Sequence, residues 1–212
     1  MLAYGKNTLQ YSELHDAVTK FSSGLIGLGL QRGERVAIYL EKRFETVIAS
    51  FGAPAAGGVF VPLNPLLKPE QVGYILRDCN VRVLITSPER LALLSDTLMQ
   101  CHDLRHVVVL DSQDPLPPGG PIAYCRWNDL LAMPKTIGHR VIDTDVAGIL
   151  YTSGSTGKPK GVVLSHRNMV AGAKSVASYL ENTNDDTLLA ALPLSFDAGF
   201  SQLTTAFHAG AR

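Results

Sequence analysis

The sequence has no excess of charge of either sign. Its 212 residues carry 19 Lys and Arg against 19 Asp and Glu, so the formal net charge is zero. Domains that bind nucleic acid usually present a basic patch, and acidic membrane surfaces attract polybasic segments. The charge balance therefore argues against a nucleic-acid partner and against a basic membrane-binding face.

Cysteine is scarce, and nothing at the start of the chain directs it out of the cell. The three cysteines, Cys79, Cys101 and Cys125, lie more than twenty positions apart and form no C-x-x-C pair. Such an odd, scattered set suits a reducing compartment better than a disulfide framework. The first residues, MLAYGKNTLQYSEL, lack the basic segment and apolar run of a secretory signal. The sequence therefore predicts a cytoplasmic protein with free thiols.

The chain also lacks an uninterrupted apolar run and a metal-binding pattern. Residues 47–67 carry no charge and are numerous enough to span a bilayer, but Pro54, Pro62 and Pro65 would break one helix. We therefore expect a buried helix, a turn and a strand there, and no membrane span. His102 and His106 have no suitably spaced carboxylate, so no metal site is predicted.

Short apolar runs alternate with helical patterns through the first half of the chain. Apolar residues at three- and four-residue steps predict a helix from Tyr11 to Leu28, with Ser12 as its N-cap. Continuous apolar strands that alternate with helices are typical of a mainly parallel sheet covered on both faces. The sequence therefore predicts an α/β fold with a mainly parallel sheet flanked by helices. Strands are expected at 36–40, within 57–63, at 81–86 and at 106–110, with helices at about 44–56, 69–79 and 88–100.

A segment rich in proline and glycine divides the chain. Residues 111–121, DSQDPLPPGGP, read as a connection between an α/β segment at 1–110 and a second one at 122–212. The second segment is expected to hold a strand that runs into Tyr151, a short strand at 162–164, a helix capped by Ser165, a buried strand at 187–194 and a helix from Gly199 to Ala209.

The stretch YTSGSTGKPKG, residues 151–161, has the composition of a phosphate-binding loop. Polyphosphate binding needs glycine for close backbone approach, hydroxyl and amide donors, and lysine for charge. The spacing is not that of a Walker A loop, because only two residues separate Gly154 from Gly157 and Pro159 follows Lys158. We interpret the stretch as a phosphate loop between two strands; the alternative is a flexible Ser/Gly turn.

At these residues the chain resembles the superfamily of AMP-forming acyl-CoA synthetases and adenylation domains, which includes luciferases. YTSGSTGKPKGVVLSHRN matches that family's phosphate-loop signature, and LQYSEL, RGERVAIYL and APAAGGVFVPLNP occur in the family's order. The family forms an acyl-adenylate from a carboxylic acid and ATP, then passes the acyl group to a thiol. The resemblance implies ATP and Mg²⁺ as cofactors, coenzyme A or phosphopantetheine as the acceptor, and a candidate acyl carrier protein as partner.

The resemblance also implies roles for individual residues. Lys160 would be the catalytic residue, because it would neutralise charge on the departing pyrophosphate. Lys158 matches a position that the family leaves variable, so we expect a solvated side chain. The residues implied to hold the ATP phosphates are Thr152, Ser153, Gly154, Ser155, Thr156, Gly157 and Lys160.

The stretch LPLSFDAGFSQL, residues 192–203, matches the part of the family that borders the substrate. Phe196 matches an aromatic residue beside the acyl and adenylate site. Asp197 matches an aspartate that pairs with the substrate's α-ammonium group in amino-acid-activating relatives, although it could instead be the N-cap of the following helix. Residues 195–211 also resemble ligases associated with bacterial exosortase loci.

Motifs that the family carries further along, including its acidic magnesium motif and a C-terminal catalytic lysine, do not occur in these residues. We therefore expect the chain to be part of the large N-terminal domain of an adenylate-forming enzyme, inactive alone, with most magnesium ligands and the C-terminal lid domain outside it. Three functions stay open: a fragment of an AMP-forming acid–thiol ligase, an amino-acid-activating adenylation module, and a non-catalytic phosphate-binding fragment.

Overall fold

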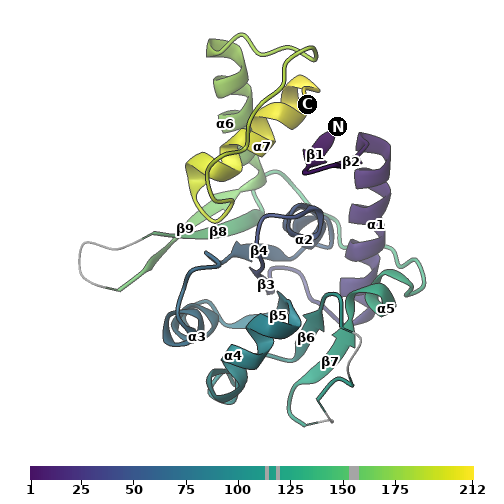
Figure 1. Ribbon diagram of the computed structural model, residues 1–212, viewed down its shortest axis with the longest axis vertical. Coiled ribbons are helices and arrows are strands. Elements are labelled where there is room, and N and C mark those ends of the chain that lie inside the picture. Colours follow the sequence, from purple (N-terminus) through teal and green to yellow (C-terminus); the bar gives the residue numbers. More distant parts are fainter. Residues whose placement is uncertain (113–114, 118–119, 153–157) are drawn as a thin grey trace.

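The computed structural model describes residues 1–112, 115–117, 120–152 and 158–212. Figure 1 shows a central sheet with helices on both sides and a short ribbon of two strands near the N-terminus. The strands are β1 (Leu2–Tyr4), β2 (Asn7–Leu9), β3 (Arg35–Tyr39), β4 (Val59–Pro62), β5 (Val81–Thr86), β6 (His106–Val109), β7 (Ala123–Arg126), β8 (Val146–Thr152) and β9 (Lys160–Ser165). The helices are α1 (Tyr11–Gly27), α2 (Phe44–Ala55), α3 (Pro69–Asp78), α4 (Pro88–Leu98), α5 (Trp127–Leu131), α6 (His166–Tyr179) and α7 (Asp197–Ala209).

The central sheet has a doubly wound arrangement. Its strand order is β7-β6-β5-β3-β4-β8-β9, and every pair except β8 with β9 is parallel. The chain moves from β3 to β4 on one side and then crosses to β5 on the other, so a switch point lies between β3 and β5. The predicted fold class, a mainly parallel sheet flanked by helices, is confirmed.

Both predicted segments contribute strands to this one sheet. β7 pairs with β6, and β8 pairs with β4 through Phe60 and Gly148. The connection at 111–121, part of which lies outside the described residues, leads from β6 to β7. Its role as a boundary within a larger domain stays a prediction.

Each face of the sheet carries its own hydrophobic core. One core joins the strands to α1, α2, α5 and α7, with the fully buried Phe21 and Phe60 among its largest side chains. The other joins them to α3 and α4 through Val72, Ile75 and Leu94. In Figure 1, α1 and α2 accordingly lie on the opposite side of the sheet from α3 and α4. Burial on both faces explains why β3, β4, β5 and β6 consist mostly of apolar residues.

Two local predictions are wrong. α1 begins at Tyr11 with Gln10 as its N-cap instead of Ser12, because the Glu13 carboxylate accepts a 2.8 Å hydrogen bond from the Gln10 amide. Residues 187–194, all of them described, form no strand, and the side chain of Leu189 is 82% exposed. The Leu188 amide donates instead to the carbonyl of Arg212, at 2.7 Å. An apolar run becomes a strand only where a neighbouring strand can pair with it.

Candidate functional site

The β8–β9 hairpin brings together two of the residues that the sequence singled out. Thr152 is the last residue of β8, Lys160 is the first of β9, and the two are paired across the strands. Directly opposed residues of an antiparallel pair project from the same face. Both side chains are exposed. The Thr152 hydroxyl and the Lys160 ammonium therefore lie side by side at the end of the hairpin where the two strands are connected.

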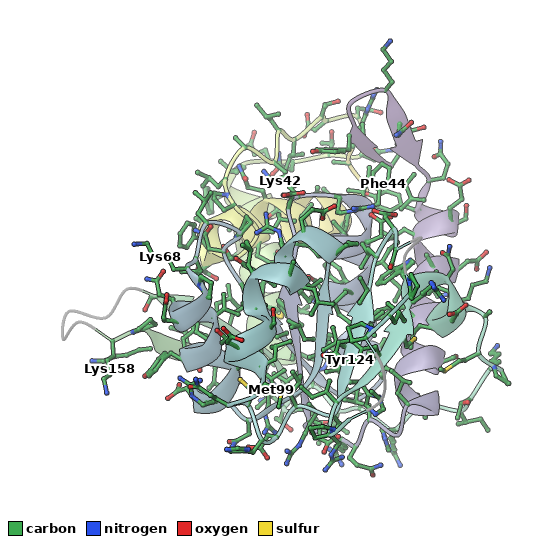
Figure 2. The ribbon with its side chains drawn as sticks, turned by 60° about the horizontal axis from the view of Figure 1, so that its bottom comes forward. Lys42, Phe44, Lys68, Met99, Tyr124 and Lys158 are labelled. Carbon is green, nitrogen blue, oxygen red and sulfur yellow. The ribbon has the colours of Figure 1, made fainter. Side chains whose placement is uncertain are left out.

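Five residues of the predicted phosphate loop lie outside the described residues: Ser153, Gly154, Ser155, Thr156 and Gly157. Lys158 follows them and is exposed. Figure 2 shows Lys158 at the outer end of the hairpin, away from the body of the protein. This position agrees with the solvated side chain expected for it.

The first turn of α7 carries the other two predicted site residues. Phe196, with extended backbone, is the N-cap of α7, and Asp197 is the first helical residue. The alternative of Asp197 as the N-cap is therefore wrong. A Cβ at Gly199 would lie 2.0 Å from the carbonyl oxygen of Pro193, so this turn packs directly on the preceding backbone. Phe196 remains 45% exposed beside it.

A cavity of about 200 Å³ connects α7 with the hairpin. Asp197 lines it, and so does Leu150, which lies two residues before Thr152 on the same face of β8. Most of the remaining lining comes from α6 and α7 and is apolar or weakly polar; it includes Leu164, Met169, Val176, Phe200, Asn168, Ser201 and Thr204. The Asp197 carboxylate stands at the N-terminal end of α7, where the helix dipole favours a negative charge. The structure thus places Asp197 on the same side of the sheet as Thr152 and Lys160.

A second cavity, of about 220 Å³, lies at the carboxyl ends of β3 and β4. Its polar lining includes Glu41 and Lys42 from the loop after β3, and Ser195 from the segment before α7. The Ser195 hydroxyl oxygen is buried and has no hydrogen-bond partner, and the Lys42 ammonium donates to the carbonyl of Ala190. Sequence reasoning missed this cavity, although the run Glu41-Lys42-Arg43 directly after a buried strand is a signal for the ligand-binding edge of a parallel sheet.

A further contact that the sequence did not indicate ties the hairpin to α3. The Tyr151 hydroxyl donates to Asp78 Oδ2 at 2.6 Å. Burial, followed by this hydrogen bond, raises the pKa of Tyr151 above its usual value. Seventy-three positions separate the two residues, so no spacing pattern could have revealed the contact.

Three further features of the described residues concern metal binding, membrane insertion and the cysteines. There, no three His, Cys, Asp or Glu side chains are grouped so that they could hold a metal ion. No helix described in the structure is both long and apolar enough to cross a membrane. Cys79, Cys101 and Cys125 are free thiols.

Comparisons with known proteins agree on one family. The model of the family described as AMP-binding enzyme matches residues 1–212. Gramicidin S synthase 2 of Aneurinibacillus migulanus is 32% identical over 90% of the chain, and a long-chain-fatty-acid–CoA ligase of Thermus thermophilus is 32% identical over 87%. The crystal structure of the anthranilate CoA ligase AuaEII with anthranoyl-AMP is 30% identical over 94% of the chain, with a TM-score of 0.85.

The chain matches only part of each of these proteins. It covers 4% of the gramicidin synthase, 33% of the Thermus ligase and 38% of the AuaEII chain.

Proposed function

Since the chain belongs to the AMP-binding enzyme family, we propose that the full-length protein activates a carboxylic acid with ATP and transfers the acyl group to a thiol. The observation that carries the proposal is the pair Thr152 and Lys160 at the hairpin end, on the same face as the cavity that Asp197 lines. The pyrophosphate leaving group would bind there, next to the Thr152 hydroxyl and the Lys160 ammonium that donate hydrogen bonds to it. The likeness to two CoA ligases supports the same reaction class.

In the proposed first step, a carboxylate oxygen of the acid attacks the α-phosphorus of ATP. The bond from that phosphorus to the bridging oxygen breaks, and pyrophosphate leaves with the electron pair. The Lys160 ammonium stabilises the negative charge that gathers on the leaving group, and the Thr152 hydroxyl donates to a phosphate oxygen. Positioning and charge stabilisation of this kind are the main contributions a protein makes to chemistry at phosphorus. Loop residues 153–157 would add further donors.

ATP fits the exposed Thr152 and Lys160, whereas magnesium has no matching group of ligands among the described residues. We therefore assign no step to the ion. If the resemblance holds, most magnesium ligands of the protein would lie outside residues 1–212, and the ATP phosphates would supply others. The acceptor would be the thiol of coenzyme A or of a carrier-protein phosphopantetheine, in a cytoplasmic setting that suits free thiols.

Pyrophosphate exchange tests the activity. The full-length protein would be incubated with ATP, labelled pyrophosphate and, in turn, fatty, aryl and amino acids. We expect labelled ATP to form with at least one acid. Failure with every acid, from a protein that still binds ATP, would rule out the ligase function.

A second candidate, an amino-acid-activating module, is favoured by one observation. Asp197 is exposed and lines the cavity next to α7, so its carboxylate would accept hydrogen bonds from an ammonium group of a substrate bound there. If the substrate carries an α-ammonium group, Asp197→Ala should lower exchange with the amino acid at least about tenfold, since hydrogen bonds to charged groups contribute about 1.5–3 kcal/mol. Exchange with the corresponding acid that lacks the amine should be unchanged. Equal effects on both acids would rule out the amine role.

The non-catalytic alternative has its own readout. The 212-residue chain would be titrated with pyrophosphate by calorimetry, with Lys160→Ala as the variant. Saturable binding that Lys160→Ala abolishes, together with no exchange by the full-length protein, would favour a phosphate-binding role. The association with exosortase loci stays a prediction from the sequence.

A further inference from the structure

α3 presents two polar side chains to the β8–β9 hairpin. Tyr74 and Asp78 are four residues apart on α3 and therefore lie on one face of it. The Asp78 carboxylate accepts the 2.6 Å hydrogen bond from Tyr151 at the end of β8. This length lies within the normal range for a hydroxyl donor and an oxygen acceptor.

Tyr74 reaches the other side of the hairpin. Its hydroxyl oxygen lies 3.3 Å from the carbonyl oxygen of Pro159 and 3.4 Å from Asp78 Oδ1. The hydroxyl has one proton, so it donates to one of these acceptors at a time. Pro159 directly precedes Lys160. The same face of α3 therefore contacts the chain on both sides of the predicted phosphate loop.

The ring of Tyr151 adds a third contact. Tyr151 is paired with Gly161 across the hairpin, and a Cβ at Gly161 would lie 3.3 Å from Tyr151 Cζ and 2.6 Å from Ile149 Cγ2. A side chain at position 161 would therefore clash with Ile149 and would press on the ring of Tyr151. Lys160 is thus flanked by two residues in contact with this cluster, Pro159 on one side and Gly161 on the other.

The beginning of β9 is held in the sheet by its pairing with β8 alone, which includes Tyr151 with Gly161 and Thr152 with Lys160. It is an edge strand whose neighbour in the sheet is β8, and its residues from Lys160 to Val163 are exposed. Side chains alternate between faces along a strand, so Tyr151 faces α3 while Thr152 projects from the opposite face. The contacts between α3 and Tyr151 on one face of the hairpin therefore set the position of Thr152 and Lys160, whose side chains project from the other face.

We propose that Tyr74, Asp78 and Tyr151 are positioning residues that hold Lys160 and Thr152 in place for the pyrophosphate leaving group. The catalytic part of this inference rests on the proposed function; the mechanical part concerns only the hairpin. None of the three touches the reacting atoms. They act through the backbone of β8 and β9.

Hydrogen exchange tests the mechanical part without reference to catalysis. The variants of the full-length protein are Asp78→Ala, which removes both acceptor oxygens, and Tyr151→Phe, which keeps the ring over Gly161 but removes the hydroxyl. Tyr4→Phe is the matched control, because Tyr4 is 53% exposed on β1. We expect amide exchange in residues 160–162 to accelerate about tenfold or more in both variants, and to be unchanged in residues 81–86 of the sheet centre. Unchanged exchange in 160–162 would overturn the proposal.

Pyrophosphate exchange kinetics test the catalytic part. Displacing a catalytic group by about 1 Å can cost about 100-fold in rate, so we expect Asp78→Ala to lower kcat between about 10- and 100-fold. The KM for the acid should change by less than about twofold, and Asp78→Asn should recover part of kcat because its amide oxygen can accept from Tyr151. Faster amide exchange with an unchanged kcat would mean that Tyr74, Asp78 and Tyr151 stabilise the hairpin without affecting catalysis. That result would overturn their positioning role. If no acid supports pyrophosphate exchange by the unmodified protein, the proposed function fails. Amide hydrogen exchange would still show whether the contacts with α3 hold the hairpin in place.

Discussion

The centre of the sheet and the β8–β9 hairpin differ in how completely they are buried. Every residue of β4 is buried, and in β5 only Arg82 is half-buried. In β9, by contrast, four residues are exposed and two are half-buried. The residues with predicted chemistry, Thr152 and Lys160, belong to the exposed region.

The difference in burial suggests that the sheet centre maintains stability, whereas the hairpin carries the proposed chemistry. The centre owes its position to hydrophobic cores on both faces, which tolerate little change. The hairpin and α7 are joined to it by the pairing of β8 with β4, by the stacking of Phe200 on Phe60, with ring centroids 4.8 Å apart, and by the bond from Tyr151 to Asp78, while β9 stays exposed. Substitutions in the centre should therefore change stability, whereas substitutions in the hairpin should change activity.

The largest expected effect on stability is at the sheet centre. Leu84 in β5 has no exposed surface, so Leu84→Ala should lower the free energy of unfolding by about 2–5 kcal/mol. Leu189→Ala, at a side chain that is 82% exposed, should change it by less than about 0.5 kcal/mol. Urea titration of the full-length protein measures both. Similar losses in the two variants would remove the distinction between the regions.

Sequence reasoning was accurate where burial is complete. The expected strand at 81–86 has the bounds of β5, because a strand buried on both faces is a continuous apolar run between turns. The run at 187–194 looked similar but forms no strand, since apolar composition does not reveal whether a partner strand exists. The order of strand, loop and strand around residues 151–164 was predicted, but the pairing of Thr152 with Lys160 was not, because both residues were assigned to the loop. The contact between Asp78 and Tyr151 depends on tertiary packing and had no signal in the sequence.

A smaller loss of stability is expected at the start of α7. The Cβ of Gly199→Ala would meet the carbonyl oxygen of Pro193 at 2.0 Å, and backbone atoms cannot yield as a flexible side chain can. We expect a loss of about 1–3 kcal/mol, as for overpacked sites, and a higher KM for the acid because Phe196 and Asp197 would be displaced. Denaturation and exchange kinetics measure the two effects. Unchanged values for both would show that this turn adapts freely.

The matched glycine in α6 should respond in the opposite direction. A Cβ at Gly172 would have no neighbour within 4 Å, so Gly172→Ala should raise the free energy of unfolding by about 0.5–1 kcal/mol. The gain reflects the better helix propensity of alanine at an open position. Destabilisation measured in the same urea titration would mean that a Cβ at Gly172 does contact neighbouring atoms.

A difference in chemical reactivity is expected for a thiol next to Asp78. Burial raises the pKa of Cys79 to about 11, against an ordinary value of 9.0, so about a hundredfold less thiolate is present at pH 8 than in the unfolded chain. Alkylation of Cys79 at pH 8, followed by mass spectrometry of its peptide, should be slower in the folded protein by about that factor. Because the folded pKa is the higher one, its contribution to stability is complete below about pH 9 and is lost as the pH rises through about 11. Equal alkylation rates in the folded and denatured protein would contradict this burial.

The proposed chemistry is tested most directly by two lysines that lie two positions apart. ATP–pyrophosphate exchange by the full-length protein would be measured for Lys160→Ala and Lys158→Ala, with the free energy of unfolding as a check on folding. We expect Lys160→Ala to lower kcat/KM by about 100- to 1,000-fold, as for the loss of one group that stabilises developing charge, while Lys158→Ala stays within about threefold of the unmodified protein. Equal effects of the two substitutions, or exchange that persists without Lys160, would contradict the assignment of Lys160 to the leaving pyrophosphate.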